Sequence, residues 1–243
     1  MAKTVEDEPD KTTQANGLDS VEESTFSLPK KWDSLRRSPR WERQRDNILA
    51  AAGRLFRGKG YLGTSVNDIA DAANTKKPAV YYYFDTKADI LYEVATRTMQ
   101  ALMALASPIL DSEMPLDRKL EALVTRHINW QISHIGFAGI GQSERSNLPP
   151  DRLRAYINMR DEYEAIFRRV IKEGVDGGIF RPIDPKLASL FVLGFMNSIV
   201  QWFNPKGPLS PEDVASEAYE FVSGYLKVMK PGAGPARQCT KER

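Results

Sequence analysis

The stretch VNDIADAANTKKPAVYYYF, residues 66–84, decides the fold. Its first part carries apolar residues at helical spacing from Val66 to Ala73, which predicts a short helix with one buried face. Asn74 follows, and asparagine is the commonest residue other than glycine to adopt a left-handed turn conformation. Pro78 suits the first turn of a second helix, because the amides there have no partner within the helix. The stretch therefore predicts two short helices joined by a tight turn.

The aromatic run YYYF, residues 81–84, divides between two environments if it is helical. An α-helix turns by about 100° per residue, so Val80 and Phe84 share one face and are expected in the core. Tyr82 points to the opposite side, whereas the other two tyrosines flank the buried face. The helix is therefore expected to present a small polar and aromatic surface to solvent or to a partner.

A longer helix is expected before this stretch, over residues 41–57, because apolar residues recur at positions 48, 51, 52, 55 and 56. The sequence GKGYLGTS, residues 58–65, ends it, and Thr64 or Ser65 is suited to cap the next helix. One helix followed by two short helices across a tight turn is the helix-turn-helix arrangement. In that arrangement the last helix enters the major groove of DNA and reads bases with its N-terminal residues.

The distribution of charge is more informative than the net charge of +2. Residues 31–60 carry nine lysines and arginines against three acids, while residues 1–30 carry three lysines against seven acids. Local basic density is expected of a surface that binds phosphates. A solvated helix face explains the same charges, so the pattern alone leaves both interpretations open.

Residues 48–91, ILAAAGRLFRGKGYLGTSVNDIADAANTKKPAVYYYFDTKADIL, resemble the DNA-binding domain of TetR-type transcriptional repressors. Two positions depart from the family pattern: Asn74 replaces a usual glycine, and Lys76 stands where a serine often caps the third helix. Lysine cannot accept the capping hydrogen bond, so this helix is expected to order fully only on DNA. The resemblance implies a double-stranded DNA operator as the partner. It also implies DNA contacts by Thr64, Ser65, Lys76, Lys77, Ala79, Tyr81, Tyr82 and Lys87.

A basic segment precedes the first long helix, and Arg36 and Arg37 in it could reach the adjacent minor groove, since narrow minor grooves attract arginine. A solvated linker is an equal alternative. The two ends of the chain are polar or rich in proline and glycine, and both are expected to be disordered. The chain is therefore divided into an acidic extension, a helix-turn-helix domain, a second helical domain and a flexible tail, over residues 1–35, 36–86, 87–229 and 230–243.

The second domain has no strand-like alternation, and helices are expected near residues 87–106, 115–135, 149–175, 185–204 and 211–229. The predicted fold is therefore all-α, with an N-terminal three-helix helix-turn-helix domain followed by a helical-bundle ligand-binding and dimerisation domain. Residues 191–222, FVLGFMNSIVQWFNPKGPLSPEDVASEAYEFV, resemble the end of repressors that control fatty-acid, phenylacetate and steroid catabolism. That resemblance implies a homodimer and an acyl-CoA thioester as inducer. The dimer contacts are expected at Phe195, Val200 and Trp202.

Aromatic residues at helical spacing could line an apolar ligand pocket in the second domain, and arginines could bind an anionic head group. The expected pocket residues are Trp130, His134, Phe137, Arg145, Tyr156, Tyr163 and Phe167. Three alternatives stay open. A drug-efflux repressor that senses cationic amphipaths would place Glu144 or Glu164 in its cavity. An architectural DNA-binding protein would have a filled cavity and no inducer, and a helical enzyme would need convergent acid and base groups.

Several classes of protein find no support in the sequence. Cys239 is the one cysteine, which excludes an intrachain disulfide and a cysteine-clustered zinc site. His127 and His134 lack acidic or cysteine partners at ligand spacing, so no metal, cofactor or catalytic residue is predicted. No apolar run approaches the ~18 residues of a membrane span, and no secretory signal is visible. A cytoplasmic protein that is not an enzyme is therefore expected.

Overall fold

The computed structural model describes residues 38–227, and within this range it confirms the all-α prediction. The acidic extension, the expected DNA contacts Arg36 and Arg37 and the C-terminal tail lie outside these residues. Strand-like pairing in the described range is limited to one bridge between Phe180 and Lys227. The helices are α2 (Pro39–Lys59), α3 (Val66–Ala72), α4 (Lys77–Tyr83), α5 (Lys87–Leu110), α6 (Leu116–Ser133), α7 (Ile140–Ser143), the 3-10 helix η1 (Arg145–Asn147), α8 (Pro150–Asp176), α9 (Pro185–Trp202) and α10 (Pro211–Leu226).

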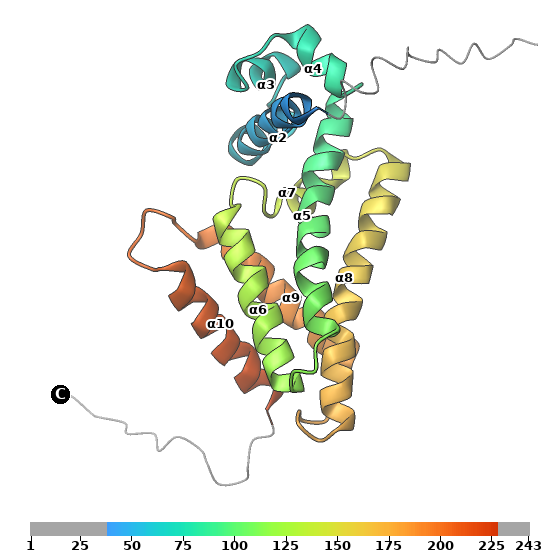
Figure 1. The fold of residues 1–243 in the computed structure, drawn as a ribbon, viewed down its shortest axis with the longest axis vertical. Coiled ribbons are helices and arrows are strands. Elements are labelled where there is room, and N and C mark those ends of the chain that lie inside the picture. Colours follow the sequence, from blue (N-terminus) through green and yellow to red (C-terminus); the bar gives the residue numbers. More distant parts are fainter. Residues whose placement is uncertain (1–37, 228–243) are drawn as a thin grey trace, which may run out of the picture.

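Helices α2, α3 and α4 form a head at one end of the molecule (Figure 1). Ser38 caps α2 by accepting a hydrogen bond from the Trp41 amide. Ser65 and Asp68 form a reciprocal capping box at the start of α3. The buried faces of the three helices meet in one apolar core, as their spacing predicts. This head core includes Ile48, Leu49, Ala51, Ala52, Phe56, Ile69, Ala70, Val80 and Phe84.

Helix α5 connects the head to the rest of the molecule, which we call the body (Figure 1). It begins beside α4 and runs down along α6 and α8, with which it packs closely. Helices α9 and α10 complete the body, where α9 packs on α8 and α10 packs on α6. The body core includes Leu102, Leu123, Phe167, Met196 and Val222. None of the helices described in this chain is long and apolar enough to cross a bilayer.

Residues 136–148 connect α6 to α8 through a loop, α7 and η1, and they pack against the head. Gly139 has a φ of +82°, a left-handed conformation that suits glycine. A Cβ atom on Gly53 would lie 3.0 Å from the Gly136 carbonyl oxygen, so α2 approaches this loop closely. Ile140 and Tyr156 belong to the head core. Side chains from beyond residue 87 therefore complete the core of the head.

Candidate nucleic-acid interface

Helix α4 presents the outer surface that its rotation predicts. Val80 is fully buried and Phe84 is nearly so, because both pack into the head core. Lys76, Lys77 and Pro78 are exposed at the start of the helix. Helix α4 is therefore held by one apolar face and carries two cations at its leading edge.

The three tyrosines of α4 have different surroundings. The Tyr83 ring lies 5.1 Å from that of Trp41 and is half-buried in the head. Tyr82 packs edge-on against Tyr83, with ring centroids 5.2 Å apart, and 38% of it is exposed. Tyr81 is 46% exposed. Both predicted contacts, Tyr81 and Tyr82, reach the surface, but Tyr81 is the more exposed, whereas rotation alone predicts Tyr82 as the outermost.

The turn between α3 and α4 has the geometry that asparagine was expected to provide. Asn74 has a φ of 50° and is the one non-glycine residue with positive φ in the described range. The Thr75 amide donates to the Ala70 carbonyl oxygen at 2.9 Å and closes the end of α3. Lys76 is the N-cap of α4 and makes no side-chain capping bond, as the sequence predicts. The turn therefore sets α4 at an angle to α3 and leaves its first residues open to a partner.

Thr64 was expected to contact DNA through its hydroxyl, and the structure contradicts this. Only 1% of Thr64 is exposed, and its Oγ1 donates to the Gly60 carbonyl oxygen at 2.8 Å. Ser65 is exposed, but its hydroxyl accepts from the Asp68 amide and donates to the Asp68 carboxylate. The hydrogen bonds from the Ser65 amide and hydroxyl lower the pKa of Asp68. Both residues thus build the start of α3, and only Ser65 stays accessible there.

Lys87 was also expected to contact DNA, but it turns into the head. Its Nζ donates to the carbonyl oxygens of Tyr61 and Thr64, each at 2.9 Å. The same ammonium lies 4.0 Å from the centre of the Tyr61 ring. Lys87 therefore ties the turn between α2 and α3 to the start of α5, and from this position we predict that it makes no contact with a DNA phosphate.

Replacing Lys87 with methionine is expected to destabilise the protein by about 1–3 kcal/mol, because two carbonyl oxygens lose a charged donor. Chemical denaturation measures the loss. The salt dependence of DNA binding should stay unchanged, since no phosphate contact is removed. Lys76→Met is the matched control, because Lys76 is exposed and should affect DNA binding without affecting stability. A lower salt slope with unchanged stability in Lys87→Met would show that Lys87 does contact DNA.

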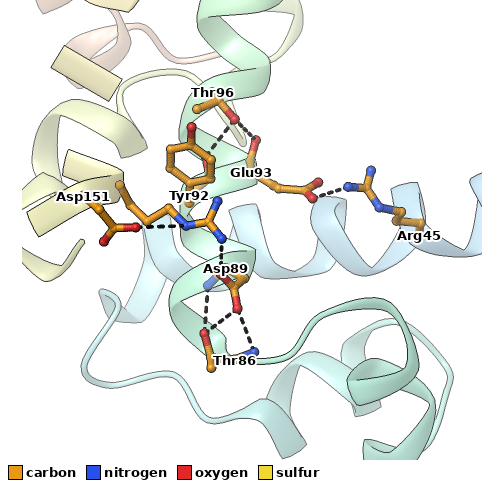
Figure 2. A network of polar contacts seen from close by, with 8 residues as sticks. Arg45, Thr86, Asp89, Tyr92, Glu93, Thr96 and Asp151 are labelled. Carbon is orange, nitrogen blue, oxygen red and sulfur yellow. Dashed lines mark hydrogen bonds and ion pairs between the residues drawn. The ribbon is translucent and has the colours of Figure 1, made fainter. Parts of the chain in front are cut away.

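A polar network joins the head, α5 and α8 (Figure 2). Arg45 on α2 pairs with Glu93 on α5. On the other side of α5, Arg152 from α8 lies 3.1 Å from the Asp89 carboxylate and 4.7 Å from the centre of the Tyr92 ring. Asp89 also belongs to the capping box of α5. The first turns of α5 are therefore held by the head and by the body at once.

The residues expected to line a ligand pocket do not surround one cavity, so that prediction is wrong as a set. Tyr163 and Phe167 are buried in the body core. Phe137 and Tyr156 pack in the head core instead. The remaining three lie near the surface: Trp130 stacks on the exposed His134 with ring centroids 4.5 Å apart, and Arg145 is exposed on η1.

His127 is buried in the body beside Tyr163. Its Nδ1 lies 3.0 Å from the Tyr163 hydroxyl, and the two rings stack. Burial lowers the pKa of His127 to about 4, although the neighbouring Asn197 opposes this change. Burial raises the pKa of Tyr163, so both groups are neutral near pH 7. The pair is therefore an uncharged polar group inside an apolar core.

Stability is expected to fall as the pH drops from 6.5 towards 4, because the unfolded chain then protonates His127 while the folded chain does not. The depressed pKa corresponds to a loss of about 3 kcal/mol across this range. Unfolding free energies of the wild type and of His127→Phe, measured at each pH, should diverge by that amount. His134→Phe is the control, since His134 is exposed. Parallel curves for the wild type and His127→Phe would contradict the buried neutral histidine.

An open cavity of about 370 Å³ lies where the end of α2 meets α7 and α9. Arg57 spans it and donates to the carbonyl oxygens of Ala138 and Val200. Val200 itself is buried, and its side chain faces Gly139. The expected role of Val200 in the dimer interface is therefore wrong, because it packs within its own subunit. Arg57 escaped the sequence analysis because its partners lie 81 and 143 residues away along the chain.

Helices α9 and α10 share an exposed apolar face. The rings of Phe195 and Phe221 stack with centroids 4.4 Å apart, and 60% of Phe221 is exposed. Trp202 borders the same face and is also exposed. The other large exposed apolar residues on these two helices and their connection are Leu187, Leu190, Phe191 and Leu209. A patch of this kind on a helical pair is typical of a protein–protein interface.

The head has the geometry of a DNA-binding helix-turn-helix, with two lysines and two tyrosines exposed on α4. Together with the helical body this defines a DNA-binding transcriptional regulator. Residues 48–94 match the family of bacterial regulatory proteins called the tetR family, and residues 113–226 match the tetracyclin repressor-like C-terminal domain. The chain belongs to the TetR family.

Similar proteins extend this assignment to nearly the whole described chain. The TetR family regulator PfmR from Thermus thermophilus is 31% identical with a TM-score of 0.68, covering 73% of this chain and 97% of PfmR. The HTH-type transcriptional repressor KstR2 from Rhodococcus jostii strain RHA1 is 29% identical, covering 74% of this chain and 89% of KstR2. AibR, solved in complex with isovaleryl coenzyme A and operator DNA, shares the fold at 24% identity and a TM-score of 0.66, covering 73% of this chain and 97% of AibR.

Proposed function

We propose that the protein is a repressor that binds a palindromic DNA operator as a homodimer and is released by an acyl-CoA-like amphipathic molecule. The observation that carries the proposal is the outer face of α4. Lys76 and Lys77 are exposed at its start, while Val80 and Phe84 on the opposite face hold the helix in the core. Such a face fits the major groove, and two-fold symmetry of the dimer matches two half-sites.

The proposed DNA contacts differ in the chemical group of DNA that each side chain binds. Lys76 and Lys77 supply cations for phosphate oxygens or for guanine edges. The hydroxyls of Tyr81 and Tyr82 suit phosphate oxygens, and Ala79 suits a thymine methyl group. Further contacts are proposed for the accessible Ser65 and for the minor-groove arm with Arg36 and Arg37.

The proposed dimer forms through the apolar face of α9 and α10. Burying Phe221, Phe195 and Trp202 against the same residues of a second copy removes a large exposed apolar patch from water. If the two-fold axis through this face runs along the length of the body, both heads lie at the same end of the dimer, as two half-sites of one operator require.

An acyl-CoA-like ligand is proposed from the charges around the body core. Arg126 is exposed at the edge of a slit between α5 and α6, where a phosphate-bearing head group could meet it. The related regulator AibR, which shares this fold, was solved with isovaleryl coenzyme A bound.

The surroundings of Glu164 do not favour a sensor of cationic amphipaths. Burial alone would raise the pKa of Glu164, but hydrogen bonds from Lys186 and Ser189 and the charge of Arg168 hold it below its ordinary value. Glu164 is therefore already neutralised within the subunit. Glu144 lines the open cavity between α2, α7 and α9, as that alternative expects, and it accepts a hydrogen bond there from Asn147.

Helix α5 is the proposed lever between ligand and DNA. Arg152 and Asp89 couple its start to α8, and Arg45 and Glu93 couple it to the head. A ligand that moves the body half of α5 therefore changes the spacing of the two heads. It shifts the equilibrium by its differential affinity for the two spacings. This role involves no catalysis, and we propose that it operates in the cytoplasm, where the operator DNA lies.

A gel shift with DNA from upstream of the protein's own gene tests the proposed function. The protein should retard this DNA but not a scrambled fragment of equal length, and a panel of acyl-CoA thioesters should include at least one that releases it. The corresponding free acids serve as controls for the head group. Equal retardation of both DNA fragments would contradict the repressor, and a complex that survives every thioester would contradict the ligand class.

A further inference from the structure

Several buried polar atoms on α5 and α6 lack a direct hydrogen bond inside the body. His127 Nε2, Gln131 Oε1 and Thr98 Oγ1 each form no hydrogen bond of good geometry with a described residue, although Asn197 lies close enough to His127 to oppose the fall in its pKa. His127 and Gln131 are each only 2% exposed. Buried polar side-chain atoms in folded proteins nearly always have a partner, so these atoms point to a molecule that supplies one.

The two α6 residues are held in place by bonds at their other ends. His127 Nδ1 pairs with the Tyr163 hydroxyl, and Gln131 Nε2 donates to Asn197 Oδ1 at 2.8 Å. His127 and Gln131 are four residues apart on α6 and therefore share one face of the helix. The free Nε2 and Oε1 atoms are thus preorganised by neighbours on α8 and α9.

The chemistry of the two free atoms selects the group that fits them. When the Tyr163 hydroxyl donates to Nδ1, His127 carries its proton on Nε2 and donates from there. Gln131 Oε1 can only accept. A hydroxyl group accepts from the first and donates to the second, whereas a ketone satisfies only the first.

A narrow slit between the two helices is lined by Leu102, Ala106 and Leu123, with His127 and Tyr163 among its walls. In this structure the slit has no room for a water molecule. At its edge Arg126 donates to the Leu105 carbonyl oxygen at 3.2 Å and bridges α6 to α5. Ligand pockets usually hold about 300–1,000 Å³, so an acyl ligand fits only when α5 and α6 separate.

We propose that the ligand carries a hydroxyl group in its apolar body, and that this hydroxyl bonds to His127 Nε2 and Gln131 Oε1 after the ligand parts α5 from α6. The proposal rests on the proposed function, since it specifies the inducer of the same repressor. It also explains how the ligand acts on DNA binding, because the helix that the ligand moves is α5, which is joined to the head.

Calorimetric titration of the full-length protein without DNA tests the hydroxyl. The probes are decanoyl-CoA and its analogues with a hydroxyl or an oxo group at each position along the chain. The best hydroxyl isomer should bind about tenfold more tightly than decanoyl-CoA, with the oxo analogue between them. If no isomer binds more tightly than the unsubstituted chain, the proposal is wrong.

Two variants separate the roles of the polar atoms. His127→Phe keeps a ring in the core and should remove the preference for both oxygenated chains. Gln131→Met keeps the length of the side chain and should remove only the advantage of hydroxyl over oxo, which preserves the test if His127→Phe does not fold. His134→Phe is the matched control. A hydroxyl preference that survives in Gln131→Met would overturn the proposal.

Release of operator DNA is measured separately by fluorescence anisotropy with the same probes. If the hydroxyl preference holds in calorimetry but the operator complex persists at saturation, the ligand response of the proposed function is wrong and the hydroxyl site stands. If only free hydroxydecanoic acids bind with the preference, the acyl-CoA class is wrong and the hydroxyl site again stands.

Discussion

A protein carrying both Lys76→Gln and Lys77→Gln is expected to bind its operator about a thousandfold more weakly than the wild type. Both side chains are exposed at the start of α4, and a dimer presents each of them twice. Fluorescence anisotropy at several salt concentrations measures the loss. The slope of log affinity against log salt should fall by about three to four units, because each phosphate contact contributes about 0.9.

The control for this variant removes the same charge elsewhere. Lys172→Gln with Lys206→Gln neutralises two exposed lysines, one near the end of α8 and one in the loop after α9. It should change operator affinity by less than about threefold. Both double variants should unfold at the wild-type temperature, since exposed substitutions rarely affect stability. An unchanged salt slope in the α4 variant would contradict the placement of this helix on DNA.

Replacing Phe221 with aspartate is expected to yield monomers and to lower operator affinity by at least about a thousandfold. Phe221 is the most exposed aromatic residue on the face of α9 and α10 and stacks on Phe195. A carboxylate there would lose its hydration against apolar side chains of a second copy. A monomer would then bind only one half-site. Light scattering after size-exclusion chromatography reports the mass, and anisotropy reports the affinity.

Ile157→Asp provides the matched change on another surface. Ile157 is exposed on α8, away from the face of α9 and α10, so this variant should remain dimeric and bind the operator normally. Circular dichroism should show wild-type helicity for both variants. A dimeric Phe221→Asp protein with full affinity would mean that the subunits associate through a different surface.

The head was predictable in detail because its signals are local. The spacing of Val66, Ile69 and Ala73, the turn at Asn74 and the rotation that separates Val80 from Tyr82 all depend on residues within one or two turns. The side chains of Thr64 and Lys87 were harder to place. The Thr64 hydroxyl bonds to the carbonyl oxygen of Gly60, four residues earlier in the same turn. The Lys87 ammonium meets carbonyl oxygens 26 and 23 residues away, which depends on the packing of α5 beside α2.

The ligand pocket was not predictable from aromatic composition. Tyr156 and Tyr163 lie on the same helix, but one completes the head core and the other the body core. The polar groups that distinguish the body interior, His127 with Tyr163 and Gln131 with Asn197, are 36 and 66 residues apart. No local pattern relates them, since each pair meets only after α6 has packed on its neighbours.

The sequence by itself determined the helices, the helix-turn-helix and the face of α4 that is free to meet DNA. Those features follow from helical periodicity, turn conformation and capping, which act over a few residues. Only the tertiary structure decided which hydroxyls and cations stay accessible, which aromatic residues share a core and which buried polar atoms lack a partner. These depend on contacts between segments far apart in the chain, where packing and desolvation select one partner among many.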